Sequence, residues 1–481
     1  MSGSARSLAV APALAAAREA LAGGEDAWVV GGAVRDAAIG RPVVDIDLVV
    51  AAGERDAALA IARAAGGPAF ELSSEFGTWR AQAGDSSWHV DVARMRGARI
   101  EDDLGLRDLT VNAIARTLGD LEAPPVDPAG GLVDLERRIL RAVSERSFAD
   151  DPLRIMRTAR LAAALDFDVE PATAELARAE SGRAGEPSGE RQLAELRMLI
   201  SGPDPVRGLR LLDDLGATAG VLPEVEALKG VEQNRNHHLD VHGHTIEVLA
   251  NLLAVEGDLD RYAGDAAADV RELLDEPLAD ELTRGTALRL GAVLHDVGKP
   301  ATREERGDGF ATFIGHDREG ARIVALTCER LKASRALTRH LEALARHHLH
   351  LGFMAAERPL PCRRLHDYLR LTEPVAADVT LLTVADRLSA RGIGPTASPE
   401  MVEAHLALAR EVLPHAVAWH RDGGPRSPLP GDELAAAVGI EPGPALGELL
   451  VEVEAGVFCG EVGTPAEAIE VARRASTAPP D

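Results

Sequence analysis

The sequence predicts an α+β protein in which a small N-terminal domain of strands and helices precedes an all-α body. Short apolar runs that read as strands lie near the N-terminus, at 27–30, 43–50 and 88–93. Hydrophobic residues make up 46% of the 481 residues, mostly Ala, Leu and Val, and only 3% are aromatic, which favours helices in the remainder. A chain of this length should hold about three or four domains.

The segment 7–17 is mostly apolar and follows Arg6, as a signal peptide would. We expect a scaffold helix instead, because Pro12 interrupts the segment and a helical pattern continues through Leu21 to the first strand. No run of about 18 uncharged apolar residues predicts a membrane span. The three cysteines have no Cys-x-x-Cys spacing, so the sequence predicts neither a disulfide framework nor a zinc ribbon and fits a reducing cytoplasm.

The formal net charge of −25 argues at first against a nucleic-acid partner. Two segments are nevertheless locally basic, since 137–160 and 318–346 each carry seven Lys or Arg residues against three Asp or Glu residues. A protein can bind the phosphate backbone of a nucleic acid through such local basic stripes alone, even when its overall charge is negative. The alternative is that both stripes are solvated helix faces.

A glycine turn and two carboxylates form the most informative stretch. Gly31 and Gly32 separate the strand 27–30 from a helix expected over 33–39, whose N–H groups can face an anion. Strand alternation places Asp45 and Asp47 on one face, an arrangement suited to Mg²⁺. Either feature alone is more often a turn or a solvated strand end, and neither a P-loop nor a dinucleotide-binding fingerprint is present in this stretch.

Further polar motifs follow in order along the chain. The strand 88–93 carries Asp91 on the face of His89, a candidate third carboxylate. The remaining motifs are Arg107-Asp-Leu-Thr-Val-Asn-Ala113, Asp127-Pro-Ala-Gly-Gly-Leu-Val-Asp134, Asp150-Asp-Pro-Leu-Arg154, and Glu190-Arg191 with Glu195.

This ordered set resembles the class II tRNA nucleotidyltransferases and bacterial poly(A) polymerases, within the polymerase-β-like nucleotidyltransferases. The resemblance implies a mixed sheet with helices in the N-terminal domain and catalytic carboxylates at Asp45, Asp47 and Asp91. It implies nucleotide binding by Gly31, Gly32, Arg35, Asp36, Arg107, Asp108, Thr110, Asn112, Asp151, Arg154 and Arg157, and RNA binding by Arg157, Arg160 and Arg191. It also implies that Asp127, Gly130, Gly131 and Asp134 form a flexible spring.

The base-reading motif has a physical rationale of its own. If Asp151 and Arg154 lie on one helix, they share a face, and they supply an acceptor and a donor. Cytosine and adenine both present an exocyclic amine beside a ring-nitrogen acceptor, whereas uracil and guanine present the reverse order. One Asp and Arg pair can therefore select C and A. An intrahelical ion pair is the structural alternative, and Asp150 departs from the family's Glu at that position.

A second centre is predicted in the back half. The apolar helical run 288–294 ends in His295-Asp296, and this ordering with scattered histidines resembles the HD phosphohydrolases. The resemblance implies metal ligation by His244, His295, Asp296 and Asp386, extended to a second metal by His316 and His348. Ni, Mn, Co or Fe would suit such a site.

These resemblances predict template-independent addition of C, C and A to tRNA 3′ ends from CTP and ATP with Mg²⁺, in a cytoplasmic protein without a membrane partner. Poly(A) polymerase, CC-only or A-only addition, and an HD phosphohydrolase with an RNA-binding front domain are the alternatives, and the oligomeric state stays open. The expected parts are a nucleotidyltransferase head at 1–145, a helical neck at 146–232, an HD metal domain at 233–395 and a helical tail at 396–481.

Overall fold

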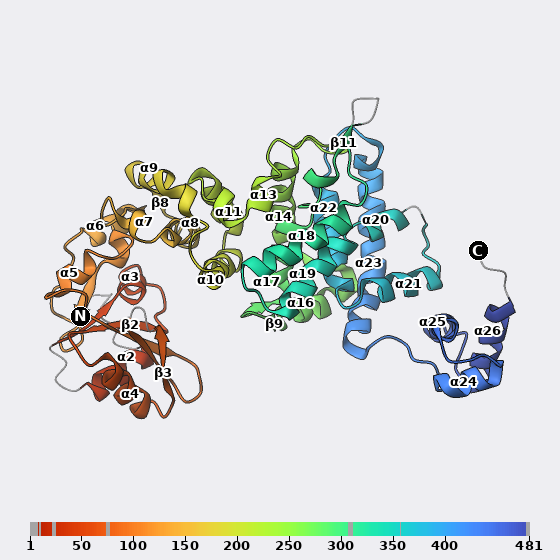
Figure 1. Cartoon of the computed structure of the whole chain (residues 1–481), viewed down its shortest axis with the longest axis horizontal. Helices are drawn as coiled ribbons and strands as arrows, with labels where there is room; N and C mark the ends of the chain where they lie inside the picture. Colours follow the sequence, from red (N-terminus) through yellow and green to blue (C-terminus); the bar gives the residue numbers. More distant parts are fainter. Residues whose placement is uncertain are drawn as a thin grey trace. The chain divides into compact units, whose positions relative to one another are not determined.

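The computed structural model describes residue 8 and residues 11–21, 26–73, 77–305, 311–355 and 357–477. They form two compact units, 1–221 and 222–481, of which the first contains the main sheet and the second is mostly helical (Figure 1). The predicted α+β class is therefore confirmed. The four-part division of the chain stays a prediction.

Unit 1 contains a six-stranded mixed sheet in the order β3-β4-β5-β2-β1-β6. Its β2 and β5 pair in parallel, and its other neighbouring pairs are antiparallel. The strands are β1 Ala27–Val30, β2 Ile46–Val50, β3 Ala69–Ser73, β4 Thr78–Gln82, β5 His89–Arg94 and β6 Ala115–Thr117.

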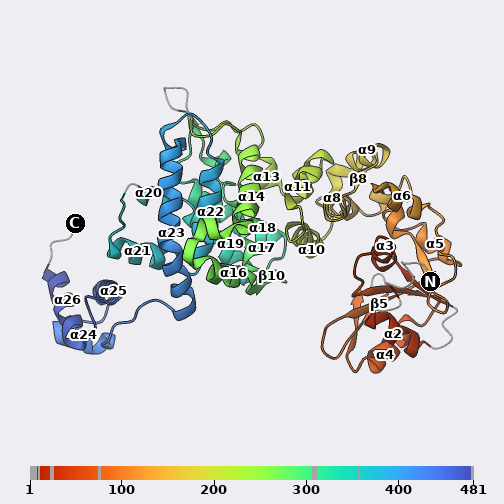
Figure 2. The ribbon, with the colours of Figure 1, turned by 180° about the vertical axis from the view of Figure 1, so that it is seen from behind.

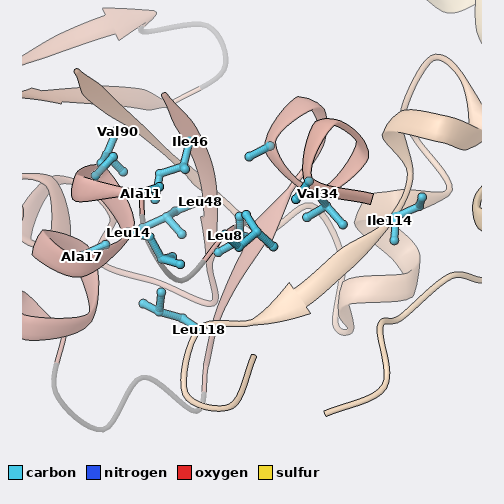
Figure 3. Close-up of a cluster of buried hydrophobic side chains, with 14 of the residues drawn as sticks. Leu8, Ala11, Leu14, Ala17, Val34, Ile46, Leu48, Val90, Ile114 and Leu118 are labelled. Carbon is cyan, nitrogen blue, oxygen red and sulfur yellow. The ribbon is translucent and has the colours of Figure 1, made fainter. Parts of the chain in front are cut away.

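Strand alternation separates the core from the polar face of this sheet. Ile46 and Leu48 on β2 and Val90 on β5 are buried in one hydrophobic cluster with α2 (Pro12–Ala20) and α4 (Glu54–Ala64) (Figure 3). Because side chains alternate, Asp47 and Asp91 face the opposite side. Leu14 on α2 is in this core, which confirms the expected scaffold helix, although the beginning of the segment at Ser7 lies outside the described residues.

Short helices complete unit 1 and carry the remaining motifs. They are α3 Gly32–Ala38, α5 Ile100–Leu104, α6 Gly131–Arg137, α7 Ser147–Asp150, α8 Leu153–Leu165, α9 Pro171–Glu180, α10 Gly189–Ile200, α11 Pro205–Asp214 and α12 Thr218–Val221. A two-stranded parallel pair, β7 Ile139–Leu140 with β8 Asp168–Val169, links the region before α7 to that after α8.

Unit 2 is built on long helices, of which α14 and α22 pack together and α22 packs on α23 (Figures 1 and 2). None of the described helices is long and apolar enough to cross a membrane. The helices are α13 Pro223–Glu226, α14 Val241–Gly257, α15 Leu259–Ala263, α16 Ala267–Asp275, α17 Arg284–Leu294, α18 His316–Arg330, α19 Arg335–His347, α20 His350–Met354, α21 Cys362–Thr372, α22 Ala376–Ser389, α23 Pro399–Asp422, α24 Gly431–Val438, α25 Pro444–Phe458 and α26 Pro465–Thr477. Two small hairpins are β9 Pro277–Ala279 with β10 Leu282–Thr283, and β11 Glu304–Glu305 with β12 Ala311–Thr312.

A disulfide joins Cys362 at the start of α21 to Cys459 after α25, with 5.7 Å between their Cα atoms. The sequence reasoning, which predicted no disulfide framework, missed this single bridge because it considered short spacings and these cysteines are 97 positions apart. Arg363 adds ion pairs of 2.7 Å to Glu452 and Glu461, so α25 is fastened to α21 by covalent and ionic contacts.

Two candidate functional sites

The glycine turn lies against the acidic face of the sheet. Gly31 has φ +71°, and a Cβ there would lie 3.1 Å from both Asp47 Oδ2 and the Nη1 atom of Arg107. A side chain would therefore strain the backbone and press on two charged groups. The predicted strand 27–30 is confirmed, and the helix expected over 33–39 is α3, which begins one residue earlier.

The three predicted carboxylates gather on the polar face. Asp47 and Asp91 are direct partners in the β2–β5 register, and Asp45 immediately precedes β2. The Oδ1 atom of Asp45 accepts a hydrogen bond of 2.9 Å from the His89 backbone N–H. The apolar run 43–50 was thus too long as a strand prediction, since β2 begins only at Ile46.

Charge around Asp47 favours a bound cation. Burial raises the pKa of Asp47, Arg107 opposes this shift, and Asp91 adds to it. Asp91 is held by Arg80 through hydrogen bonds of 2.7 and 2.8 Å. Because Asp45 and Asp47 lack such a bidentate arginine among the described residues, they fit Mg²⁺ better than Asp91 does.

A cavity of about 220 Å³ opens beside the turn and is lined by Gly31, Gly32, Arg35, Asp47, Arg107, Asp108, Asn112, Arg157, Arg160 and Leu161. Arg35 bonds Asn112 at 2.7 Å and pairs with Asp36 at 2.9 Å. Asn112 in turn donates to Asp108 at 3.1 Å. The predicted triphosphate and ribose residues are therefore one connected polar wall.

Asp108 is the ionised anchor of this wall. Burial alone would raise its pKa, but Arg157 and the hydrogen bonds from Asn112 and Leu109 hold the pKa of Asp108 below its usual range. Glu195 pairs with Arg157 at 3.4 Å and with Arg160 at 2.6 Å. A carboxylate from α10 thus orients two arginines of α8 that line the cavity.

The segment predicted to act as a spring is tied to this wall. Asp127 accepts from the backbone N–H groups of Gly131 and Leu132 at 2.7 and 2.9 Å, and Thr110 donates to Asp134 at 2.7 Å. A Cβ on Gly131 would lie 2.1 Å from the Thr110 carbonyl oxygen, so this glycine permits the close approach.

The base-reading residues line a separate pocket of about 430 Å³ with Arg96, Leu106, Pro152, Glu186 and Pro187. Asp151 is not on a helix with Arg154, because Pro152 separates α7 from α8. That geometric prediction was wrong, and so was the alternative of an intrahelical ion pair. Asp151 instead pairs with Arg191 at 2.7 Å.

Arg154 is fixed by backbone carbonyl groups. Its Nη1 and Nη2 atoms donate to the carbonyl oxygens of Leu106, Arg107 and Ser147 at 2.8 to 3.3 Å. Asp150 pairs with Arg146 at 3.0 Å. The guanidinium and the carboxylate of the motif therefore line one pocket while each is oriented by a different neighbour.

Most arginines of the basic stripe at 137–160 have partners within the protein. Arg141, Arg146, Arg157 and Arg160 pair with carboxylates, and Arg154 is held by carbonyl groups, so RNA binding by this stripe stays a prediction. The sequence count missed this because the carboxylate partners include residues outside the stripe, such as Glu195 on α10.

The six predicted HD residues converge in unit 2. They form two ligand groups, His244 with His295 and Asp386, and Asp296 with His316 and His348, and within each group the ligand atoms lie within 4.8 Å of one another. Five helices meet here, since His244 lies on α14, the His-Asp pair follows α17, His316 begins α18, His348 follows α19 and Asp386 lies on α22.

The histidines are oriented as metal ligands usually are. His295, His316 and His348 place Nδ1 2.8, 2.6 and 2.7 Å from the carbonyl oxygens three residues earlier. This arrangement favours an Nδ1–H tautomer and leaves Nε2 for a metal. The Nε2 atoms of His316 and His348 lie 3.2 Å apart and 3.5 and 3.7 Å from Asp296 Oδ1, so these donors converge and fit a metal.

Two further residues of this site were missed by the sequence reasoning. Lys299 places Nζ 2.6 Å from Asp296 Oδ2 and lines the pocket, and its position one helical turn after Asp296 was the available signal. His237 also lines the pocket, with its ring centroid 4.6 Å from that of His244, but no sequence spacing pointed to it. Burial alone would raise the pKa of Asp296, yet His295 and Lys299 hold this pKa well below its usual range.

Comparisons with known proteins agree with this two-site architecture. Three family profiles match: the poly A polymerase head domain over 27–141, the probable RNA and SrmB-binding site of polymerase A over 166–229, and the HD domain over 241–391. The chain is 36% identical over 451 residues to the A-adding tRNA nucleotidyltransferase of Deinococcus radiodurans, covering 92% of this chain and 94% of that one.

A second relative and a solved structure extend the likeness over nearly the whole chain. The CC-adding tRNA nucleotidyltransferase of Geobacter sulfurreducens is 31% identical over 453 residues, covering 93% of this chain and 91% of the relative. The Thermotoga maritima CCA-adding enzyme, solved in complex with tRNA, covers 98% of each chain with a TM-score of 0.60 and 20% identity, a likeness of fold.

Proposed function

The chain belongs to the tRNA nucleotidyltransferase family, and from this premise we propose that it adds C, C and A to the 3′ ends of tRNA, using CTP and ATP. The observation that carries the proposal is the acidic face of the sheet. There Asp47 and Asp91 lie side by side, Asp45 precedes Asp47, and the Gly31 turn opens a polar cavity against them.

The reaction is an in-line attack of the tRNA 3′ hydroxyl on the α-phosphate, with pyrophosphate as the leaving group. Bound Mg²⁺, held by Asp45 and Asp47, would activate the hydroxyl and offset the charge on the pyrophosphate. Asp91, which is fixed by its ion pair with Arg80, completes the acidic face of the sheet beside Asp47. Gly31, Gly32, Arg35 and Arg107 contact the triphosphate, and the Asp108–Asn112 pair with Thr110 positions the ribose.

Base choice belongs to the pocket between α7, α8 and α10. Asp151 supplies an acceptor and Arg154 a donor to the edge of C or A, while Arg191 orients Asp151. Asp150 pairs with Arg146 and not with Arg154, so its role is to line the pocket and not to orient the base-reading guanidinium. Arg157 and Arg160, oriented by Glu195, contact the nucleotide and the incoming RNA end.

Addition of the final A alone is a second candidate, because an A-adding relative is 36% identical over 92% of this chain. Three tRNA transcripts, ending before CCA, after the first C and after the second C, distinguish the candidates when each is incubated with CTP, ATP, UTP or GTP. Full CCA addition extends all three, whereas an A-only enzyme extends only the third and a CC-only enzyme only the first two. Repeated A addition would identify a poly(A) polymerase, and no incorporation would overturn the proposal.

The back half supports a second activity, a metal-dependent phosphohydrolase acting on 2′,3′-cyclic phosphates or phosphomonoesters. His244, His295, Asp296, His316, His348 and Asp386 would hold Ni, Mn, Co or Fe. Lys299 lies where it can neutralise a substrate phosphate. Because tRNA is the substrate of the first centre, we place the enzyme in the cytoplasm, where a disulfide such as Cys362–Cys459 is exposed to reduction.

A further inference from the structure

One face of α19 carries a row of arginines without carboxylate partners. Arg335, Arg339 and Arg346 are exposed, and none has an ion pair within the part of the chain that the structure describes. Spacings of four and seven residues place them on one side of the helix, about 6 and about 10 Å apart along its axis. The opposite side, with Leu337, Leu341 and Leu344, is buried.

Many other arginines of this unit meet carboxylates, as Arg289 does at Glu256 and Arg330 at Glu224. The α19 row differs from these because its three unpaired arginines share one helix face. Glu342, the acidic residue of this helix, is half-buried and makes no ion pair within the described part of the chain. In a chain of net charge −25, an unpaired arginine row is a surface suited to phosphates.

The C-terminal end of α19 reaches the HD pocket. Arg346 is in the last turn of this helix, and His348 and His350, which follow it, line a pocket of about 510 Å³ together with Asp296 and Lys299. Two apolar side chains at this pocket are strongly exposed, Ile314 at 83% and Phe353 at 73%. An exposed aromatic ring beside a phosphate site is a platform on which a base can stack.

We propose that the arginine face of α19 binds the backbone phosphates of a single-stranded RNA 3′ end and delivers its last nucleotide to the HD pocket, with the base on Phe353. The substrate of this site is then an RNA terminus rather than a free nucleotide. This inference rests on the proposed phosphohydrolase function. Water adds across one P–O bond of a terminal 2′,3′-cyclic phosphate, which leaves a phosphomonoester on one ribose oxygen and a hydroxyl on the other.

The kinetic test compares a 12-nucleotide RNA ending in a 2′,3′-cyclic phosphate with 2′,3′-cyclic AMP on the metal-loaded full-length protein. The variant Arg335→Glu/Arg339→Glu/Arg346→Glu should raise KM for the RNA at least tenfold and leave kcat/KM for cyclic AMP within twofold. The slope of log KM against log salt should fall by about 2, from three phosphate contacts at about 0.7 each. The matched control is Arg271→Glu/Arg421→Glu/Arg426→Glu, which reverses three exposed arginines of unit 2 outside α19 and should change neither KM.

A binding test keeps the inference separate from hydrolysis. The same RNA with a 4-thiouridine at its 3′ end should cross-link to the peptide containing Phe353, and the α19 variant should lose this cross-link while the control keeps it. An unchanged RNA KM in the α19 variant, or cross-links confined to residues 1–221, would overturn the proposal. If neither substrate is hydrolysed, the phosphohydrolase function is wrong, and a retained, α19-dependent cross-link would still support the RNA surface.

Discussion

At Gly31 the backbone has φ +71°, and a Cβ would press on Asp47 and Arg107 at once. Gly31→Ala should therefore lower nucleotide addition by at least about tenfold, because displacement of a reacting group by a fraction of an ångström is costly. Single-turnover incorporation on a matched tRNA measures this effect.

The control is Gly40→Ala, at φ +75° with nothing within 4 Å of the added Cβ. Gly40→Ala should cost about 1 to 2 kcal/mol in the free energy of unfolding, and Gly31→Ala more, because Gly31 combines φ +71° with ψ −136° and its added Cβ would meet two charged groups. Equal activity of the two variants would show that the Gly31 turn has no role in the site.

Arg154 is the residue on which base choice should depend. Arg154→Ala removes one donor from the pocket and should reduce discrimination against UTP and GTP by about 1 to 3 kcal/mol, or roughly 5- to 150-fold. Arg146→Ala, which frees only Asp150, should keep discrimination near the wild-type value. The ratio of kcat/KM for ATP and GTP reports the result, and an unchanged ratio in Arg154→Ala would refute the base-reading assignment.

Among the elements, those bounded by glycine or showing clear alternation were predictable. The strand 27–30, the helix after Gly31 and the helix ending at His295 follow from local signals. The prediction that Asp151 shares a helix with Arg154 failed, because the helix is interrupted at Pro152 and Asp151 lies before the interruption. Contacts between distant segments, such as Glu195 with Arg157, leave no periodic trace in one sequence.

The α21–α25 connection gives a chemical test at the same scale. Of the three cysteines, Cys362 and Cys459 are paired and Cys328 is buried, with burial raising its pKa to about 11. Air-oxidised protein should show no rapidly reacting thiol when native, one after denaturation without reductant, and three after denaturation with reductant. Titration with a chromogenic disulfide reagent measures this, and three thiols without reductant would exclude the disulfide.

Across the whole molecule, each centre takes its residues from its own unit. The nucleotidyl-transfer residues lie within 1–221 and the six HD residues within 222–481. Because each unit supplies its own ligands, loss of one centre should leave the geometry of the other intact.

The most direct measurement compares nucleotide incorporation, metal content and hydrolysis of 2′,3′-cyclic phosphate in wild type, Asp47→Asn and His295→Ala/Asp296→Ala. Asp47→Asn should fall below about 1% of wild-type addition while keeping tRNA binding and HD metal. The double variant should lose transition metal and hydrolysis while its addition stays near normal. Wild-type addition by Asp47→Asn, together with loss of addition in the double variant, would contradict the account.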